Sequence, residues 1–157
     1  MPAPFLSEPM EVETRWLDYN GHLNMAFYNV LMDHGVDQLW EALGFGPDYR
    51  ETTGCTTYSA EYHMRYVREL HAGAMVRASY QLLDWSPKSF HFYQELIHED
   101  GWIAATGEGL GLHVDQSGPR VVAMPPSILA KFEALFAEHS QLPRPAHVGH
   151  PIGIRRK

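Results

Sequence analysis

Residues 24–43, NMAFYNVLMDHGVDQLWEAL, decide the fold. Apolar or small side chains recur there every three or four positions, which is the period of an amphipathic α-helix. They are Tyr28, Leu31, Met32, Gly35, Val36, Leu39, Trp40 and Leu43. Asn24 is a favourable N-cap and Gly44 a favourable C-terminal stop. We therefore expect one long helix that buries one face.

The opposite face of this helix is polar. Asp33, Asp37 and Glu41 follow one another at a spacing of four, which places three carboxylates on one side. Like charges in such a row are typical of a solvated helix face. We therefore expect a solvated face here, and not a metal site.

The apolar period changes from helical to two after a Gly- and Pro-rich passage at 44–54. The alternation predicts strands at 58–67, 76–83, 89–97 and 102–114. Turn signals at 84–88 and 99–101 join consecutive strands. A strand around Val12 precedes the long helix, and Pro125-Pro126-Ser127 begins a short one. This order predicts an α+β fold in which an antiparallel sheet wraps around one long helix.

Gly107, Gly109 and Gly111 fall on one face of the last predicted strand. Glycine weakens a strand, so three in alternation need a structural reason. We expect the long helix to lie close against this face, because missing side chains permit close approach.

Length and composition indicate an ordinary soluble protein. The 157 residues fit a single domain at 1–140 followed by an irregular, proline-rich tail at 141–157. The single cysteine, Cys55, excludes an internal disulfide and suits a cytoplasmic location. We expect neither a signal peptide nor a membrane span. The net charge of -7 argues against a nucleic-acid partner.

The turn before the long helix holds the candidate chemistry. Residues 18–22, DYNGH, place a carboxylate and an imidazole beside a helix N-terminus. Free backbone N–H groups and the positive end of the helix dipole can stabilise an oxyanion there. A nearby carboxylate can act as nucleophile or general base. The same residues also form a common Asx turn that has no chemistry.

The element order and the string Asp18…Gly21-His22-x-Asn24…Tyr28 resemble the hotdog-fold acyl-CoA thioesterases of the 4-hydroxybenzoyl-CoA type, over about residues 11–125. A finer likeness to betainyl-CoA thioesterases rests on 16–22 (WLDYNGH), 58–63 (YSAEYH) and 112–115 (LHVD). The family often has a second asparagine where this chain has Met25. The resemblance implies no metal and no cofactor. It also implies a homodimer joined edge to edge, with active sites at the interface, and in many members a dimer of dimers.

The resemblance implies that Asp18 is the catalytic carboxylate, which attacks the thioester directly or activates a water. His22 either orients the turn, binds the acyl group or has a purely structural role. Asn24 is more typical of a cap than of a catalyst. The remaining candidates for substrate binding are Trp16, Tyr28, Tyr58, Glu61 and His63. The alternative for Glu61 and His63 is an exposed, salt-bridging strand face.

Aromatic residues suit a betaine acyl group, because a quaternary ammonium binds to ring faces. The expected cage consists of Tyr58, Tyr62, Tyr66, Trp16 and Trp85. Packing in the core or at a dimer interface is the alternative for each ring. Candidates for binding the CoA phosphates are Arg65, Arg68, Lys88 and the tail arginines.

The ten histidines show no spacing typical of a zinc motif, so we expect no metal site. Two other functions remain open: a non-catalytic hotdog protein that binds acyl-CoA, and a hotdog dehydratase. Asp18 disfavours the first, because a carboxylate at the helix mouth repels an anionic ligand. It disfavours the second, because that chemistry is built around a histidine base.

Overall fold

The computed structural model describes residues 1–157. Its sheet has four long antiparallel strands: β3 (Cys55–Tyr66), β4 (Met75–Trp85), β5 (Ser89–His98) and β6 (Ile103–Asp115). The short strands are β1 (Phe5–Leu6), β2 (Met10–Glu11) and β7 (Arg120–Val121). The strand order is β1-β4-β5-β6-β3, with β2 beside β4 and β7 beside β6. One edge of the sheet is therefore β3, a strand with a single neighbour.

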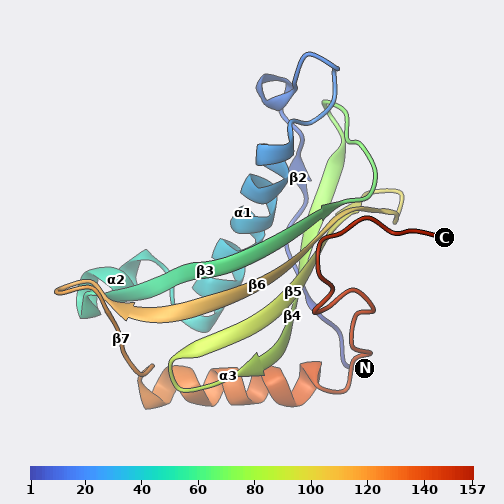
Figure 1. Cartoon of the computed structure of the whole chain (residues 1–157). Coiled ribbons are helices and arrows are strands. Elements are labelled where there is room, and N and C mark those ends of the chain that lie inside the picture. The colour runs from blue at the N-terminus through green and yellow to red at the C-terminus, as the bar shows by residue number, and fades with distance from the viewer.

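Helix α1 (Met25–Leu43) packs on β4 and β5, while α3 (Pro126–His139) packs on β4 (Figure 1). The predicted α+β fold, with an antiparallel sheet around one long helix, is confirmed. The Asn24 side chain caps α1 by accepting the Ala26 N–H at 3.0 Å. Gly44 ends the helix in the left-handed conformation at φ 85°. Both predicted ends of the helix are confirmed.

Two short helices were not predicted. A single 3₁₀ turn covers Thr14–Trp16, and α2 (Pro47–Thr53) lies within the Gly- and Pro-rich passage. Helix α2 begins with a proline, has seven residues and buries none of them. It therefore has no apolar period by which a sequence could reveal it.

The long helix approaches the sheet closely at its own glycine. A Cβ added to Gly35 would lie 2.5 Å from the Cβ of Ala78 on β4. Gly35 lies between two core clusters, one around Leu31 and the other around Leu39. The helix therefore contacts β4 at a point where neither partner has a large side chain.

The prediction for the glycines of β6 is wrong. Side chains of neighbouring strands occupy the space above them: Tyr62 over Gly107, Phe92 over Gly109 and Phe90 over Gly111. These glycines make room for aromatic rings of β3 and β5, and not for the helix backbone.

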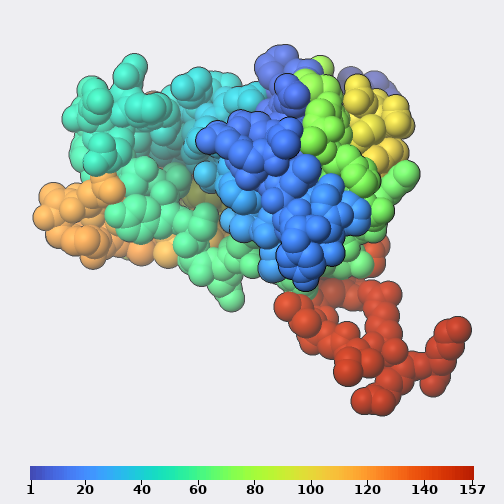
Figure 2. Space-filling view, turned by 90° about the horizontal axis from the view of Figure 1, so that it is seen from above, coloured from blue at the N-terminus to red at the C-terminus, as the bar shows by residue number.

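Residues 141–157 form no helix or strand, and Figure 2 shows this tail extending from the body of the molecule. A hydrogen bond joins the tail to the sheet: the Gly149 N–H donates to Glu108 Oε2 on β6 at 2.9 Å. None of the helices has the length and apolar character needed to cross a lipid bilayer.

Candidate functional site

A tight turn at residues 18–22 holds Asp18 at the start of α1. The Asp18 N–H donates to the His22 carbonyl at 2.9 Å, and the Asn24 N–H donates to the Trp16 carbonyl at 2.9 Å. Gly21 adopts φ 76°, a conformation that glycine permits. Asp18 Oδ1 accepts the Asn20 N–H at 2.8 Å, while Oδ2 accepts no hydrogen bond. The Asx turn is therefore formed, and one carboxylate oxygen remains free.

Most backbone amides at this helix start already have partners. The Ala26 N–H donates to the Asn24 side chain, and the Phe27 N–H donates to the Asn24 carbonyl at 2.9 Å. The Leu23 N–H donates to the Leu70 carbonyl at 2.8 Å. The N–H of Met25, the first residue of α1, has no partner. It is therefore the free donor within the helix start.

Trp16 and Tyr28 are buried around this turn. Trp16 is 7% exposed and stacks on Phe27, with ring centroids 5.5 Å apart. The Tyr28 hydroxyl donates to the Arg68 carbonyl at 3.3 Å and accepts the Leu70 N–H at 3.2 Å. In this structure the Tyr28 hydroxyl ties the helix start to the β3–β4 loop, and neither side chain lines either of the two main cavities.

A cavity of about 470 Å³ lies between α1 and β3. Asn29, Asp33, Asp37 and Glu41 line it from the helix. Its aromatic lining consists of Trp40, Phe45, Tyr58, Tyr62, Phe90 and Phe92. Asp33, Asp37 and Glu41 are all exposed, as expected of a solvated helix face, and they also share this pocket with aromatic rings. We call it the α1–β3 pocket.

The α1–β3 pocket is electrostatically suited to a cation. Burial, together with the nearby charge of Asp33, raises the pKa of Asp37 above its ordinary value. A cation beside Asp37 would relieve this unfavourable charge. Arg50 is the single positive residue of the lining, and its Nε donates to Gln116 Oε1 at 2.9 Å.

The wall of the pocket at Tyr62 is fixed by hydrogen bonds. The Tyr62 hydroxyl donates to Gln94 Oε1 at 3.0 Å, and Gln94 Nε2 donates to the Met32 carbonyl at 3.2 Å. Burial raises the pKa of Tyr62, so its hydroxyl stays neutral. The pocket therefore presents this phenol as a ring held in place, and not as a titrating group.

Glu61 and His63 alternate with Tyr62 along β3, so their side chains project from the other face of the sheet. They line a second cavity of about 360 Å³ with His91 and Glu108. Burial acts to raise the pKa of Glu108, but hydrogen bonds from Gly149 and His91 outweigh it and lower that pKa. The structure does not bring Glu61 or His63 together with Asp18 or with the α1–β3 pocket.

The expected cage of five rings does not form, and that prediction is wrong. Tyr58 and Tyr62 line the α1–β3 pocket, but Trp16 belongs to the core cluster at the other end of α1. The Tyr66 hydroxyl donates to the Met25 carbonyl at 3.1 Å, and Trp85 lines neither of the two main cavities.

The four additional rings of the pocket, Trp40, Phe45, Phe90 and Phe92, escaped sequence reasoning because each has the pattern of a core residue. One signal was present. Trp40 lies three residues after Asp37, so its ring and that carboxylate share one side of the helix.

Comparisons with known proteins place these features in a family. The model of the Thioesterase-like superfamily matches residues 12–132. A betainyl-CoA thioesterase of Pseudomonas aeruginosa is 35% identical over 140 residues, which cover 88% of each chain. An L-carnitine dehydrogenase/betainyl-CoA thioesterase of Agrobacterium fabrum is 34% identical over 149 residues, which cover 95% of this chain and 30% of that protein. The present chain thus spans about a third of the length of that bifunctional relative.

Among solved structures, a hypothetical protein from Staphylococcus aureus in complex with CoA superimposes with a TM-score of 0.91. It is 25% identical in sequence, and the match covers 99% of this chain and 98% of that one.

Proposed function

Because this chain belongs to the thioesterase-like superfamily, we propose that it hydrolyses betainyl-CoA to betaine and CoA as a homodimer, which pairs further into a dimer of dimers. Hydrolysis of an acyl-CoA thioester is the reaction of the family and of the named relatives. The acyl group, the catalytic residues, the assembly and a cytoplasmic location are our proposal.

The observation that carries the choice of acyl group is the lining of the α1–β3 pocket. A trimethylammonium group donates no hydrogen bond, so its recognition depends on ring faces and negative charge. The pocket offers both, with Asp33 and Asp37 on one side and rings such as Trp40 and Tyr62 on the others.

The pocket lies far from the Asp18 of its own chain. Asp37 is thirteen residues beyond the cap at Asn24, which is about 20 Å along the helix at about 1.5 Å per residue. In betainyl-CoA a single methylene separates the ammonium nitrogen from the thioester carbonyl. When the ammonium group of betainyl-CoA lies beside Asp37, its thioester carbonyl is therefore out of reach of Asp18 in the same chain.

A second copy of the chain supplies the missing carboxylate. Strand β3 is an open sheet edge with exposed apolar residues, including Tyr58 and Tyr66. Such an edge is suited to pairing with another strand. The bond from Tyr66 to Met25 places the helix start at the C-terminal end of β3, while Thr56 and Thr57 line the pocket at its N-terminal end. Antiparallel pairing of two β3 strands thus brings one helix start to the other protomer's pocket.

In this dimer the partner's Asp18 attacks the thioester carbonyl or removes a proton from the water that does so. The partner's Met25 N–H, the free donor of the helix start, stabilises the oxyanion. The tetrahedral intermediate then collapses with loss of the CoA thiolate. Attack by water gives the carboxylate of betaine directly, whereas attack by Asp18 gives a mixed anhydride on Asp18, which a water then hydrolyses to betaine and the free Asp18 carboxylate. Asn24 is assigned to the cap, and His22 to the turn.

The test compares betainyl-CoA with 3,3-dimethylbutanoyl-CoA, its uncharged tert-butyl isostere, by following thiol release. We expect betainyl-CoA to be preferred by roughly ten- to several-hundred-fold in kcat/KM, since two or three rings engage the cation. The variant Asp37→Asn should reduce this preference, whereas the matched Asp48→Asn, outside the pocket, should not. Equal turnover of both substrates would refute the betainyl assignment. Binding without turnover of any acyl-CoA would favour the alternative, a non-catalytic acyl-CoA-binding protein.

A further inference from the structure

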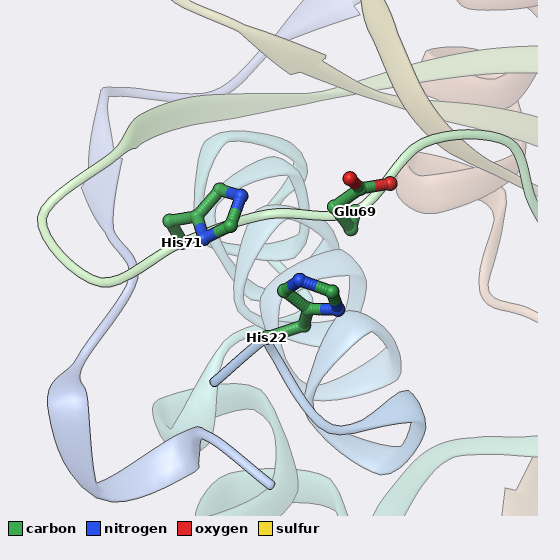
Figure 3. A group of neighbouring side chains, drawn as sticks. All are labelled: His22, Glu69 and His71. Carbon is green, nitrogen blue, oxygen red and sulfur yellow. The ribbon is translucent and has the colours of Figure 1, made fainter. Parts of the chain in front are cut away.

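A second group of chemically active side chains lies beside the Asp18 turn. His22 comes from that turn, and Glu69 and His71 come from the loop between β3 and β4 (Figure 3). One imidazole nitrogen of each histidine and one carboxylate oxygen of Glu69 all lie within 4.8 Å of one another. The two imidazole rings are perpendicular, with centroids 5.0 Å apart.

The backbone between these side chains is rigidly anchored. The Leu23 N–H donates to the Leu70 carbonyl at 2.8 Å, and these two residues adjoin all three side chains in sequence. Leu23 is 3% exposed and Leu70 is 1% exposed, so the bond that joins the two segments is buried. The Tyr28 hydroxyl ties the same loop a second time, through the Leu70 N–H. The three side chains are thus held together, and the two imidazole rings contact each other edge to face.

None of the three side chains serves another interaction of the fold. His22, Glu69 and His71 make no side-chain hydrogen bond and no ion pair in the structure. The neighbouring cation, Arg68, is engaged elsewhere, with its guanidinium 4.0 Å above the ring of Trp102. The cluster therefore offers three donor side chains that have no hydrogen-bond or ion-pair partner.

Two imidazoles and one carboxylate are a donor set preferred by divalent transition-metal ions. In a tetrahedral zinc site, ligands about 2.1 Å from the ion lie about 3.4 Å from one another. Small rotations of these partly exposed side chains achieve that spacing. We propose that His22, Glu69 and His71 form a binding site for a divalent transition-metal ion of the zinc class, with a fourth position left to water.

The proposed site departs from the expectation of no metal, which was drawn from the family resemblance and from the spacing of histidines in the sequence. It is separate from the hydrolytic chemistry, in which no step uses a metal. A bound ion would link the β3–β4 loop to the Asp18 turn through a second connection, in addition to the backbone hydrogen bonds. Its primary consequence is therefore resistance of this end of the molecule to opening.

The test is metal binding by the purified, chelator-treated protein. Titration calorimetry with zinc should give one site per chain, and cobalt should produce the visible absorption of a coordinated ion. The variants His71→Ala and Glu69→Gln should each weaken zinc binding by at least about tenfold. The matched control His34→Ala removes an exposed histidine outside the cluster and should bind zinc as the natural sequence does.

Three results would overturn the proposal: no saturable zinc binding, equal affinity in His71→Ala, or binding of magnesium as tight as that of zinc. A zinc-dependent rise in melting temperature that is lost in His71→Ala but kept in His34→Ala would support it. These measurements involve no substrate, so their outcome is independent of whether the chain hydrolyses betainyl-CoA.

Discussion

Mixing two inactive variants tests whether each active site is built from two chains. Asp18→Asn removes the carboxylate at the helix start, and Asp37→Lys reverses a charge in the α1–β3 pocket. Both residues lie at least partly in solvent, so neither change disturbs the core. We expect each variant alone to form dimers with little betainyl-CoA hydrolysis.

The geometry sets the size of the recovery. If Asp18 of one protomer serves the pocket of the other, a mixed dimer has one site with both defects and one site with none. Random exchange makes about half of all dimers mixed, so about a quarter of the sites regain full activity. If Asp18 served its own pocket, each site of a mixed dimer would carry one defect, and mixing would restore nothing.

The assay is thiol release from betainyl-CoA after subunit exchange, monitored until the rate is constant. Mixing Asp18→Asn with the matched variant Asp48→Asn provides the control and should give about half of full activity in either arrangement. Recovery in the control together with none in the test mixture would refute the two-chain site. A fully active monomer in sedimentation experiments would refute it as well.

Other predictions concern the same chain. Asp18→Asn should lower kcat by at least about 10³ while circular dichroism and dimerisation stay unchanged, and near-normal turnover would contradict its role. Exhaustive chelation should leave hydrolysis intact, because no proposed step uses a metal. Gly109→Ala should lower the free energy of unfolding by about 1–3 kcal/mol in denaturant titrations, because its Cβ would overlap the Phe92 ring. Gly118→Ala, with open space around it, is the control. Burial lowers the pKa of His139, whose Nδ1 accepts the Leu82 N–H, so unfolding takes up a proton as the pH falls below 6.5. The free energy of unfolding should therefore decrease as the pH falls below 6.5, and it should decrease less in the variant His139→Gln than in the natural sequence.

Much of the fold could be predicted because its elements carry complete local signals. Helix α1 combines a 3.6-residue period with a cap at each end, and the structure begins and ends it at the predicted residues. The long strands alternate over much of their length, and recognisable turns join β4 to β5 and β5 to β6. Helix α2 has neither period nor buried residues, and so its sequence resembles that of a loop.

The glycines of β6 show where local patterns are insufficient. Their alternation correctly indicated that something approaches this face closely. What approaches is decided by register, which pairs Phe90 with Gly111 and Phe92 with Gly109 across neighbouring strands. Register depends on contacts between segments and cannot be inferred from one strand alone.

A candidate site could be predicted when its residues are close together in the sequence, and could not when they are far apart. The turn from Asp18 to Asn24 is a contiguous motif, and the structure places it at the helix start. The α1–β3 pocket collects residues from Asn29 to Gly111, and the cluster of His22 with His71 spans 49 residues of sequence. No spacing rule reaches across such separations, because tertiary packing alone brings the side chains together.

The carboxylates of the pocket also act against the wrong substrates. Every acyl-CoA carries the negative phosphates of CoA, so a pocket lined by Asp33, Asp37 and Glu41 weakens the binding of esters in general. A cationic acyl group reverses this effect, because its charge is balanced at the place where repulsion would otherwise be strongest. In the proposed pocket, specificity arises from repulsion of anionic acyl groups and from uncompensated desolvation of the carboxylates by neutral ones, as well as from attraction of the cation. Neutralising Asp37 should accordingly reduce the difference in kcat/KM between the two substrates. It should lower the value for betainyl-CoA and raise the value for its uncharged isostere.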